Sequence, residues 1–255
     1  MKVFKNIYSL NLRLNLNRLV SKDQIRKRIW SKMVELNISK FPPPFGRIPN
    51  FVGSEHAAKK LFTTDLWKNA KTVKVNPDSP QAPVRLKALE DNKTLIMPTP
   101  RIKQGFLLLE PKLIPKEKFS FASTIRGAFI FGKKVQIKEL PDIDLVIVGS
   151  VAVNMLGERV GKGEGYSEIE WALVREEGKV SDNTPVVTTV HDIQVIEERF
   201  EIKDYDLPVD WIITPTKIIK TNPVPVKPKQ IYWNMLSENK IKEIPILFEK
   251  WKEKI

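Results

Sequence analysis

Short apolar runs alternate with amphipathic segments through most of the chain. The apolar and β-branched runs predict five strands, at residues 72–75, 94–97, 145–148, 185–190 and 211–214. Helical spacing of apolar residues predicts helices at 22–37, from near 54, at 84–90 and at 166–176. Short apolar strands that alternate with helices are typical of a parallel sheet covered on both faces. The pattern predicts a three-layer α/β/α fold with a mainly parallel, doubly wound sheet, whose ligands gather at the carboxyl ends of the strands.

The first predicted helix has a clear start. Ser21 followed by Gln24 has the spacing of a capping box, and the apolar residues that follow it recur at helical intervals, at Ile25, Ile29, Met33 and Leu36. Residues 41–53 then hold four prolines and two glycines, which predict a loop before the second helix. We expect this loop to cover a site.

The patterning divides the chain into three parts. Residues 1–20 are interpreted as an N-terminal extension, 21–220 as one α/β domain, and 221–255 as a C-terminal extension packed on that domain. In the first part, leucines at positions 10, 12, 14 and 16 alternate with polar residues, which favours an edge strand or a disordered extension and leaves a mitochondrial leader open. In the last part, the prolines of 222–228 predict an extended segment, and Pro245 interrupts the amphipathic stretch 231–255.

The composition limits the cellular compartment and the kinds of partner that we expect. The chain has no cysteine, which excludes disulfides and thiolate metal sites and fits a reducing compartment, so a cytoplasmic protein is expected. No apolar run approaches the roughly 18 to 20 residues of a membrane helix. The net charge of +13 favours anionic partners, among them nucleotides, nucleic acid and polyglutamylated cofactors.

The residues between the strand at 145–148 and the helix at 166–176 carry the main chemical signal. They read R-V-G-K-G-E-G-Y-S-E from Arg159 to Glu168. Glycines at alternate positions let the backbone approach an anion at the start of a helix, while the neighbouring arginine and lysine supply positive charge. Glu168, in the first helical turn, could hold Mg²⁺ between phosphate oxygens. The spacing is neither that of a Walker loop nor that of a dinucleotide fingerprint.

A flexible surface loop is the alternative interpretation of this stretch, with Glu168 only complementing the helix dipole. Lys22 and Arg26 favour a phosphate site, because they lie one turn apart on the same face of the first helix. The chain has only two histidines, His56 and His191, which excludes a three-histidine metal centre, and both are interpreted as structural or surface residues. Asp192 could orient a ligand or cap the turn that follows it.

Residues 145–176, taken together with Lys22 and Arg26, resemble the 5-formyltetrahydrofolate cyclo-ligase family, the methenyltetrahydrofolate synthetases. Members of that family have a sequence like R-x-G-x-G-x-G-Y-Y-D after an apolar strand and loop, which this chain matches from Arg159 to Glu168. The family's K-x-x-x-R pair matches Lys22 and Arg26. The resemblance covers most of residues 22–220.

Later segments extend the resemblance. Residues 190–192 followed by 208–214 are similar to the family's aspartate and its closing strand. Residues 228–247 look like the extension of archaeal relatives and of the methenyltetrahydrofolate-synthase-domain-containing branch, in which we place the chain.

The resemblance implies ATP- and Mg²⁺-dependent closure of 5-formyltetrahydrofolate, or of a related pterin, by a three-layer α/β/α enzyme. Lys22, Arg159 and Tyr166 would be catalytic, and Glu168 would hold the metal. The nucleotide and pterin would be bound by Lys22, Arg26, Gln81, Arg159, Gly161, Lys162, Gly163, Glu164, Gly165 and Tyr166.

Three positions depart from the family pattern. Ser167 replaces the second tyrosine of the motif, and Glu168 replaces the aspartate at the metal. Gln81 stands where the family has an acidic residue that contacts the pterin, and it offers hydrogen bonds but no charge. A non-catalytic RNA-binding protein, with Trp30 and Trp233 near basic residues, and a bare nucleotide sensor remain alternatives.

Overall fold

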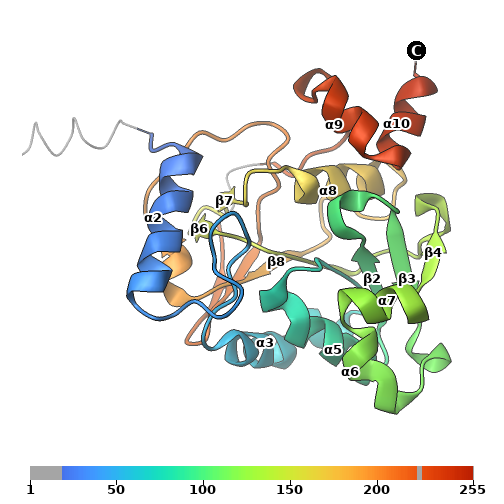
Figure 1. The fold of residues 1–255 in the computed structure, drawn as a ribbon, viewed down its shortest axis with the longest axis horizontal. Helices are drawn as coiled ribbons and strands as arrows, with labels where there is room; N and C mark the ends of the chain where they lie inside the picture. The colour runs from blue at the N-terminus through green and yellow to red at the C-terminus, as the bar shows by residue number, and fades with distance from the viewer. Residues whose placement is uncertain (1–18, 223–225, 255) are drawn as a thin grey trace, which may run out of the picture.

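The computed structural model describes residues 19–222 and 226–254 (Figure 1). The predicted N-terminal extension, apart from its last two residues, lies outside this description, as does part of the predicted extended segment 222–228. The helices are α2 (Lys22–Glu35), α3 (Ser54–Thr63), α4 (Asp65–Asn69), α5 (Ala82–Glu90), α6 (Phe119–Ala122), α7 (Ile125–Phe131), α8 (Tyr166–Glu176), α9 (Glu238–Glu243) and α10 (Pro245–Lys252). Within the described ranges, no helix is long and apolar enough to cross a membrane.

An eight-stranded sheet forms the centre of the molecule, in the order β11-β10-β8-β5-β1-β2-β3-β4. Its strands are β1 (Thr72–Val75), β2 (Thr94–Pro98), β3 (Phe106–Leu109), β4 (Lys133–Val135), β5 (Leu145–Val148), β8 (Val186–Thr189), β10 (Trp211–Ile213) and β11 (Ile218–Lys220). The five strands from β10 to β2 run parallel, while β11, β3 and β4 join antiparallel at the edges. The predicted mainly parallel α/β fold is confirmed.

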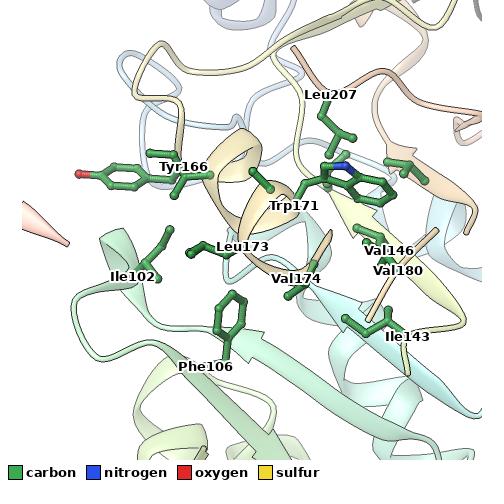
Figure 2. Close-up of a cluster of buried hydrophobic side chains, with 14 of the residues drawn as sticks. Ile102, Phe106, Ile143, Val146, Tyr166, Trp171, Leu173, Val174, Val180 and Leu207 are labelled. Carbon is green, nitrogen blue, oxygen red and sulfur yellow. The ribbon is translucent and has the colours of Figure 1, made fainter. Parts of the chain in front are cut away.

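Successive side chains of the central strands enter two different cores. Leu145 and Ile147 of β5 pack into a cluster with apolar residues of α3 and α5, whereas Val146 and Val148 join a cluster with residues of α8. Figure 2 shows the second cluster, with Trp171 near Val146. Both faces of the sheet are therefore covered, which is why the central strand β5 is an apolar run without alternation.

A small second sheet interrupts the predicted path from β5 to the glycine-rich stretch. Strands β6 (Ala152–Asn154) and β7 (Arg159–Val160) pair antiparallel, and β9 (Val195–Ile196) pairs parallel with β6. The prediction passed directly from β5 into a loop, and was wrong here, because strands of two or three residues are too short to show a period. Arg159 consequently lies in a strand.

The C-terminal helices share the core of the α8 face. Ile241, Ile244 and Leu247 are buried in the same cluster as Trp171. The Trp171 Nε1 atom donates a 2.7 Å hydrogen bond to the carbonyl oxygen of Pro228. Pro245 is the first residue of α10, so it separates two helices where the sequence predicted an interruption.

Candidate functional site

A cavity of about 780 Å³ lies where the parallel strands β1 and β2 end and α8 begins. Its wall includes residues 76–79 after β1, 99–101 after β2, and the glycine-rich stretch 161–165. Pro42, Arg47 and Ile48 add a wall from the proline-rich loop that was expected to cover a site. Of the predicted site residues, all but Gln81 line this cavity.

The glycine-rich stretch brings open backbone amides to the start of α8. Gly165 is the N-cap of that helix in a left-handed conformation, with φ of 73°, and no side chain caps the helix start. Gly163 also has a positive φ, of 103°. An L side chain seldom adopts either conformation, which accounts for glycine at both positions. The first amides of α8, which make no helical hydrogen bond, therefore remain donors for an anion at the cavity.

Helix α2 fixes two cations beside this stretch. The Nζ atom of Lys22 pairs with Asp206, and Arg26 pairs with Asp23. The Nε atom of Arg26 also donates a 2.8 Å hydrogen bond to the carbonyl oxygen of Gly161. The predicted capping box, Ser21 with Gln24, is present and fixes the start of the helix. Each cation keeps donors that its protein partners do not use.

Arg159 is buried among protein partners. The residue is 4% exposed, and its Nη1 atom donates to the carbonyl oxygen of Gly149 at 2.8 Å. The Nε atom donates to the carbonyl oxygen of Leu207 at 3.2 Å, and Nη2 pairs with Glu168. Burial lowers the pKa of Arg159 to about 10, which leaves it charged at neutral pH. The guanidinium thus anchors the loop and orients Glu168. The sequence had instead predicted that Arg159 is a loop residue whose charge binds phosphate.

Glu168 is the carboxylate best placed for a cation at the helix start. It stands in the first turn of α8, lines the cavity, and uses Oε1 for Arg159. In the described residues no group of three or more histidine, cysteine or acidic side chains forms a metal cluster. Magnesium is nevertheless commonly held by one or two carboxylates together with phosphate oxygens, so the side chains present fit Mg²⁺ brought with a nucleotide.

Two further cations differ in how they are held. Lys162 pairs with Glu164 across 2.6 Å within the glycine-rich stretch. Arg47, which the sequence analysis missed, is exposed at the cavity wall and takes part in no ion pair within residues 19–222 and 226–254. The backbone carbonyl of Arg47 accepts a 3.1 Å hydrogen bond from Trp30 Nε1, so helix α2 positions this loop.

The floor of the cavity is a buried polar network. Lys74 of β1 pairs with Glu170 of α8 and donates a 2.6 Å hydrogen bond from Nζ to Oδ1 of Asn76. The Asn76 side chain donates in turn to the Ser167 hydroxyl at 2.9 Å. Burial raises the pKa of the Glu170 carboxyl, although Lys74 opposes the shift. Ser167, at the position of the family's second tyrosine, is thus a member of this network.

Gln81 does not reach the cavity, which corrects its predicted role. It is 0% exposed, and its side-chain amide donates a 3.1 Å hydrogen bond to Thr189 Oγ1. The carboxyl group that lines the cavity in this region belongs to Asp78, three residues earlier. Burial raises the pKa of the Asp78 carboxyl against the attraction of Lys162 and Arg85. The sequence did contain an acidic residue here, before the 3₁₀ turn Ser79–Gln81.

The remaining candidates serve the fold. His191 caps a turn by accepting from the Ile193 amide, and the Asp192 carboxylate accepts a 2.6 Å hydrogen bond from Thr214. Neither lines the cavity. Trp30 is buried, with its indole nitrogen bonded to the backbone, so it does not offer an exposed ring for stacking on a base.

Comparison with known proteins adds an independent view. The model of the 5-formyltetrahydrofolate cyclo-ligase family matches residues 18–215. The methenyltetrahydrofolate synthase domain-containing proteins of Bos taurus and Homo sapiens are 42% and 40% identical to this chain over 232 residues. These matches cover 89% of this chain and 61% of each relative, so the chain spans about three fifths of the length of the curated relatives it matches.

A solved structure shares the fold. The NMR structure of Aquifex aeolicus 5,10-methenyltetrahydrofolate synthetase superimposes with a TM-score of 0.50 at 21% sequence identity. The superposition covers 78% of this chain and 92% of the other. At this identity, the likeness concerns the fold alone.

Proposed function

Because the chain belongs to the 5-formyltetrahydrofolate cyclo-ligase family, we propose that it closes 5-formyltetrahydrofolate to 5,10-methenyltetrahydrofolate with ATP and Mg²⁺. One observation carries the proposal. Cations from α2 and from the glycine-rich stretch converge, in one cavity, on the open amides at the start of α8. Such an arrangement stabilises phosphate charge, which is the main catalytic need in phosphoryl transfer.

The phosphates of ATP would lie along the glycine-rich stretch. Lys22, Arg26 and Lys162 would donate to them, together with the amides that follow Gly163 and Gly165. Arg47 would approach from the proline-rich loop, since it lines the same cavity and pairs with no carboxylate among the described residues. Arg159 would act indirectly, by holding Glu168 and the loop in place.

Magnesium would be held by Glu168 and the phosphate oxygens. When bound, the ion would neutralise charge that develops on the transferred phosphoryl group. The contribution of the chain itself is orientation, because the buried Arg159 fixes the Glu168 carboxylate at the helix start.

The reduced folate would lie toward the polar floor. There Asp78 would contact the pterin, as the acidic residue of the family does. In the reaction, the formyl oxygen attacks the γ-phosphorus and ADP leaves. N10 of the folate then attacks the formyl carbon, and inorganic phosphate departs with the former formyl oxygen while N10 loses its proton. The cavity would favour the first step by keeping the formyl oxygen in line with the γ-phosphate.

The test is a turnover assay on the full chain. Absorbance of the methenyl product should rise only when 5-formyltetrahydrofolate, ATP and Mg²⁺ are all present. A folded sample that binds ATP but forms no product would contradict the proposal and favour a nucleotide sensor. Retention of RNA at moderate salt, without turnover, would instead favour the RNA-binding alternative. A cytoplasmic setting remains a prediction from the absence of cysteine.

A further inference from the structure

Part of the cavity wall comes from a segment beyond the family match. The match ends at residue 215, yet Ile231, Tyr232, Met235, Leu236 and Lys240 all line the cavity. In Figure 1, α9 and α2 lie on opposite sides of the loop that enters α8. The chain therefore adds a part to the cavity wall that residues 18–215 alone do not supply.

This wall is firmly attached to the domain. Ile231 is buried in the α8-side core, and its amide donates a 2.9 Å hydrogen bond to Glu176 at the end of α8. Lys250 of α10 pairs with Glu177 across 2.6 Å. Contacts at both ends of the segment hold it as a fixed surface, so its side chains have defined positions for a ligand.

The wall also meets the first residue of α8. The Tyr166 hydroxyl donates a 2.8 Å hydrogen bond to Glu243, and the Lys240 Nζ atom lies 3.8 Å from the centre of the tyrosine ring. Figure 2 shows the Tyr166 ring directed away from Trp171 at the start of α8. Tyr166 was predicted to be a catalytic residue, but its hydroxyl is hydrogen-bonded to the C-terminal segment. It thus connects that segment to the start of α8, where the proposed phosphate site lies.

The exposed side chains of the wall have a mixed character. Met235 is 51% exposed although it lines the cavity, and Tyr232 and Leu236 continue the apolar surface beside it. At the rim, Lys240 uses one of its donors for Glu243, at 3.3 Å, and keeps others. Arg101 lies nearby, 3.8 Å from Glu243 and 3.7 Å from Glu164. Apolar surface followed by cationic groups suits a ligand whose aromatic part ends in carboxylates.

We infer that the C-terminal segment 231–240 is a specificity wall, on which Met235 and Leu236 receive the aromatic ring of the substrate and Lys240 receives its terminal carboxylate. This inference rests on the proposed function, because a reduced folate carries a benzoyl ring and a glutamate beyond its pterin. It assigns a substrate-binding role to residues outside the family match.

The test separates binding of the folate from binding of ATP. Lys240→Met should raise the KM for 5-formyltetrahydrofolate about tenfold, the loss expected for a hydrogen bond between charged groups, while kcat and the KM for ATP stay within about twofold. Lys240→Arg should restore most of the affinity. Lys242→Met is the matched control, since Lys242 lies on the same helix, pairs with Glu238 and does not line the cavity.

A second substrate tests whether Lys240 binds the terminal carboxylate of the folate. The dimethyl ester of 5-formyltetrahydrofolate should show the raised KM with the wild-type protein, and Lys240→Met should bind the ester and the free acid equally. An unchanged KM in Lys240→Met, or a rise of equal size in Lys242→Met, would overturn the specificity wall while leaving the proposed function in place. A wild-type protein that neither binds nor converts the folate would overturn both.

Discussion

The Nε atom of Arg26 donates a 2.8 Å hydrogen bond to the carbonyl oxygen of Gly161, 135 residues away in the sequence. Two residues further along, a Cβ atom on Gly163 would lie 3.2 Å from the Arg26 Cζ atom. The guanidinium therefore rests on the glycine-rich stretch, and position 163 has little room for a side chain. This contact joins the two halves of the proposed phosphate site.

Replacement of Gly163 should damage this contact. Gly163→Ala should raise the KM for ATP at least about tenfold, because the methyl group displaces Arg26 and the backbone must leave its φ of 103°. Gly178→Ala is the control, since Gly178 also has a positive φ but open space around it. Both variants should lose about 1 to 2 kcal/mol of stability from the left-handed backbone, and only the first should lose ATP affinity. Equal KM values would contradict the assigned contact.

Glu168 should set the magnesium requirement. Glu168→Gln keeps an acceptor for Arg159 but loses the charge, so the Mg²⁺ concentration for half-maximal activity should rise about tenfold at saturating ATP. A magnesium titration of steady-state turnover measures this. Glu177→Gln, at the other end of α8, should leave the titration unchanged. A normal magnesium dependence in Glu168→Gln would place the metal elsewhere.

Arg47 should bind the nucleotide from the loop side. Arg47→Gln is expected to raise the KM for ATP about threefold to tenfold without a change in melting temperature, because its side chain is exposed at the cavity and unpaired among the described residues. Arg28→Gln removes an equal charge from α2, at a residue that pairs with Glu198 outside the cavity. If both variants weaken ATP binding equally, general charge rather than a specific contact is responsible.

Asp78 should make stability depend on pH in a defined direction. Burial raises the pKa of its carboxyl above the ordinary 3.8, so the folded protein holds a proton that the unfolded chain releases. Stability contributed by this group is present below that ordinary pKa and is lost as pH rises toward the folded pKa. Asp78→Asn has no carboxyl group at this position, so this pH-dependent loss of stability should be absent. The melting temperature of the variant minus that of the wild type should therefore grow as pH rises above about 4.

The same series on Asp142→Asn, at an exposed position outside the cavity, supplies the control. A constant difference for Asp78→Asn would show that the carboxyl is not stabilised in its protonated form by the fold.

The central fold was predictable because the sequences of its main strands are recognisable without knowledge of their partners. The run at 145–148 is apolar throughout, as expected for a strand buried on both faces, and the run at 72–75 is β-branched apart from Lys74; their bounds agree with β5 and β1. Strands β6 and β7, with three and two residues, are set by pairing with each other and, for β6, with the distant β9, and they are too short to carry a local pattern. The same limit hid the edge strand β4, which has three residues, whereas the apolar run of β3 had the pattern of a buried strand and the prediction missed it.

The residues that line the cavity were largely predictable from the sequence, but the contacts between them were not. The spacing of Lys22 and Arg26 placed both on one face of α2, and both line the cavity. The pairing of Arg159 with Glu168 depends on how β7 packs against α8, which local sequence does not encode. Likewise, only the path of the chain after β1 directs Asp78 to the cavity and Gln81 toward Thr189.

The central claim is that the cavity transfers a phosphoryl group from ATP to the formyl oxygen of the folate. The most direct measurement follows that oxygen. With 5-formyltetrahydrofolate labelled with ¹⁸O in the formyl group, mass spectrometry of the inorganic phosphate should find one label for each methenyl product formed. Phosphate without label, or ATP hydrolysis that continues without the folate and forms no methenyl product, would contradict the account.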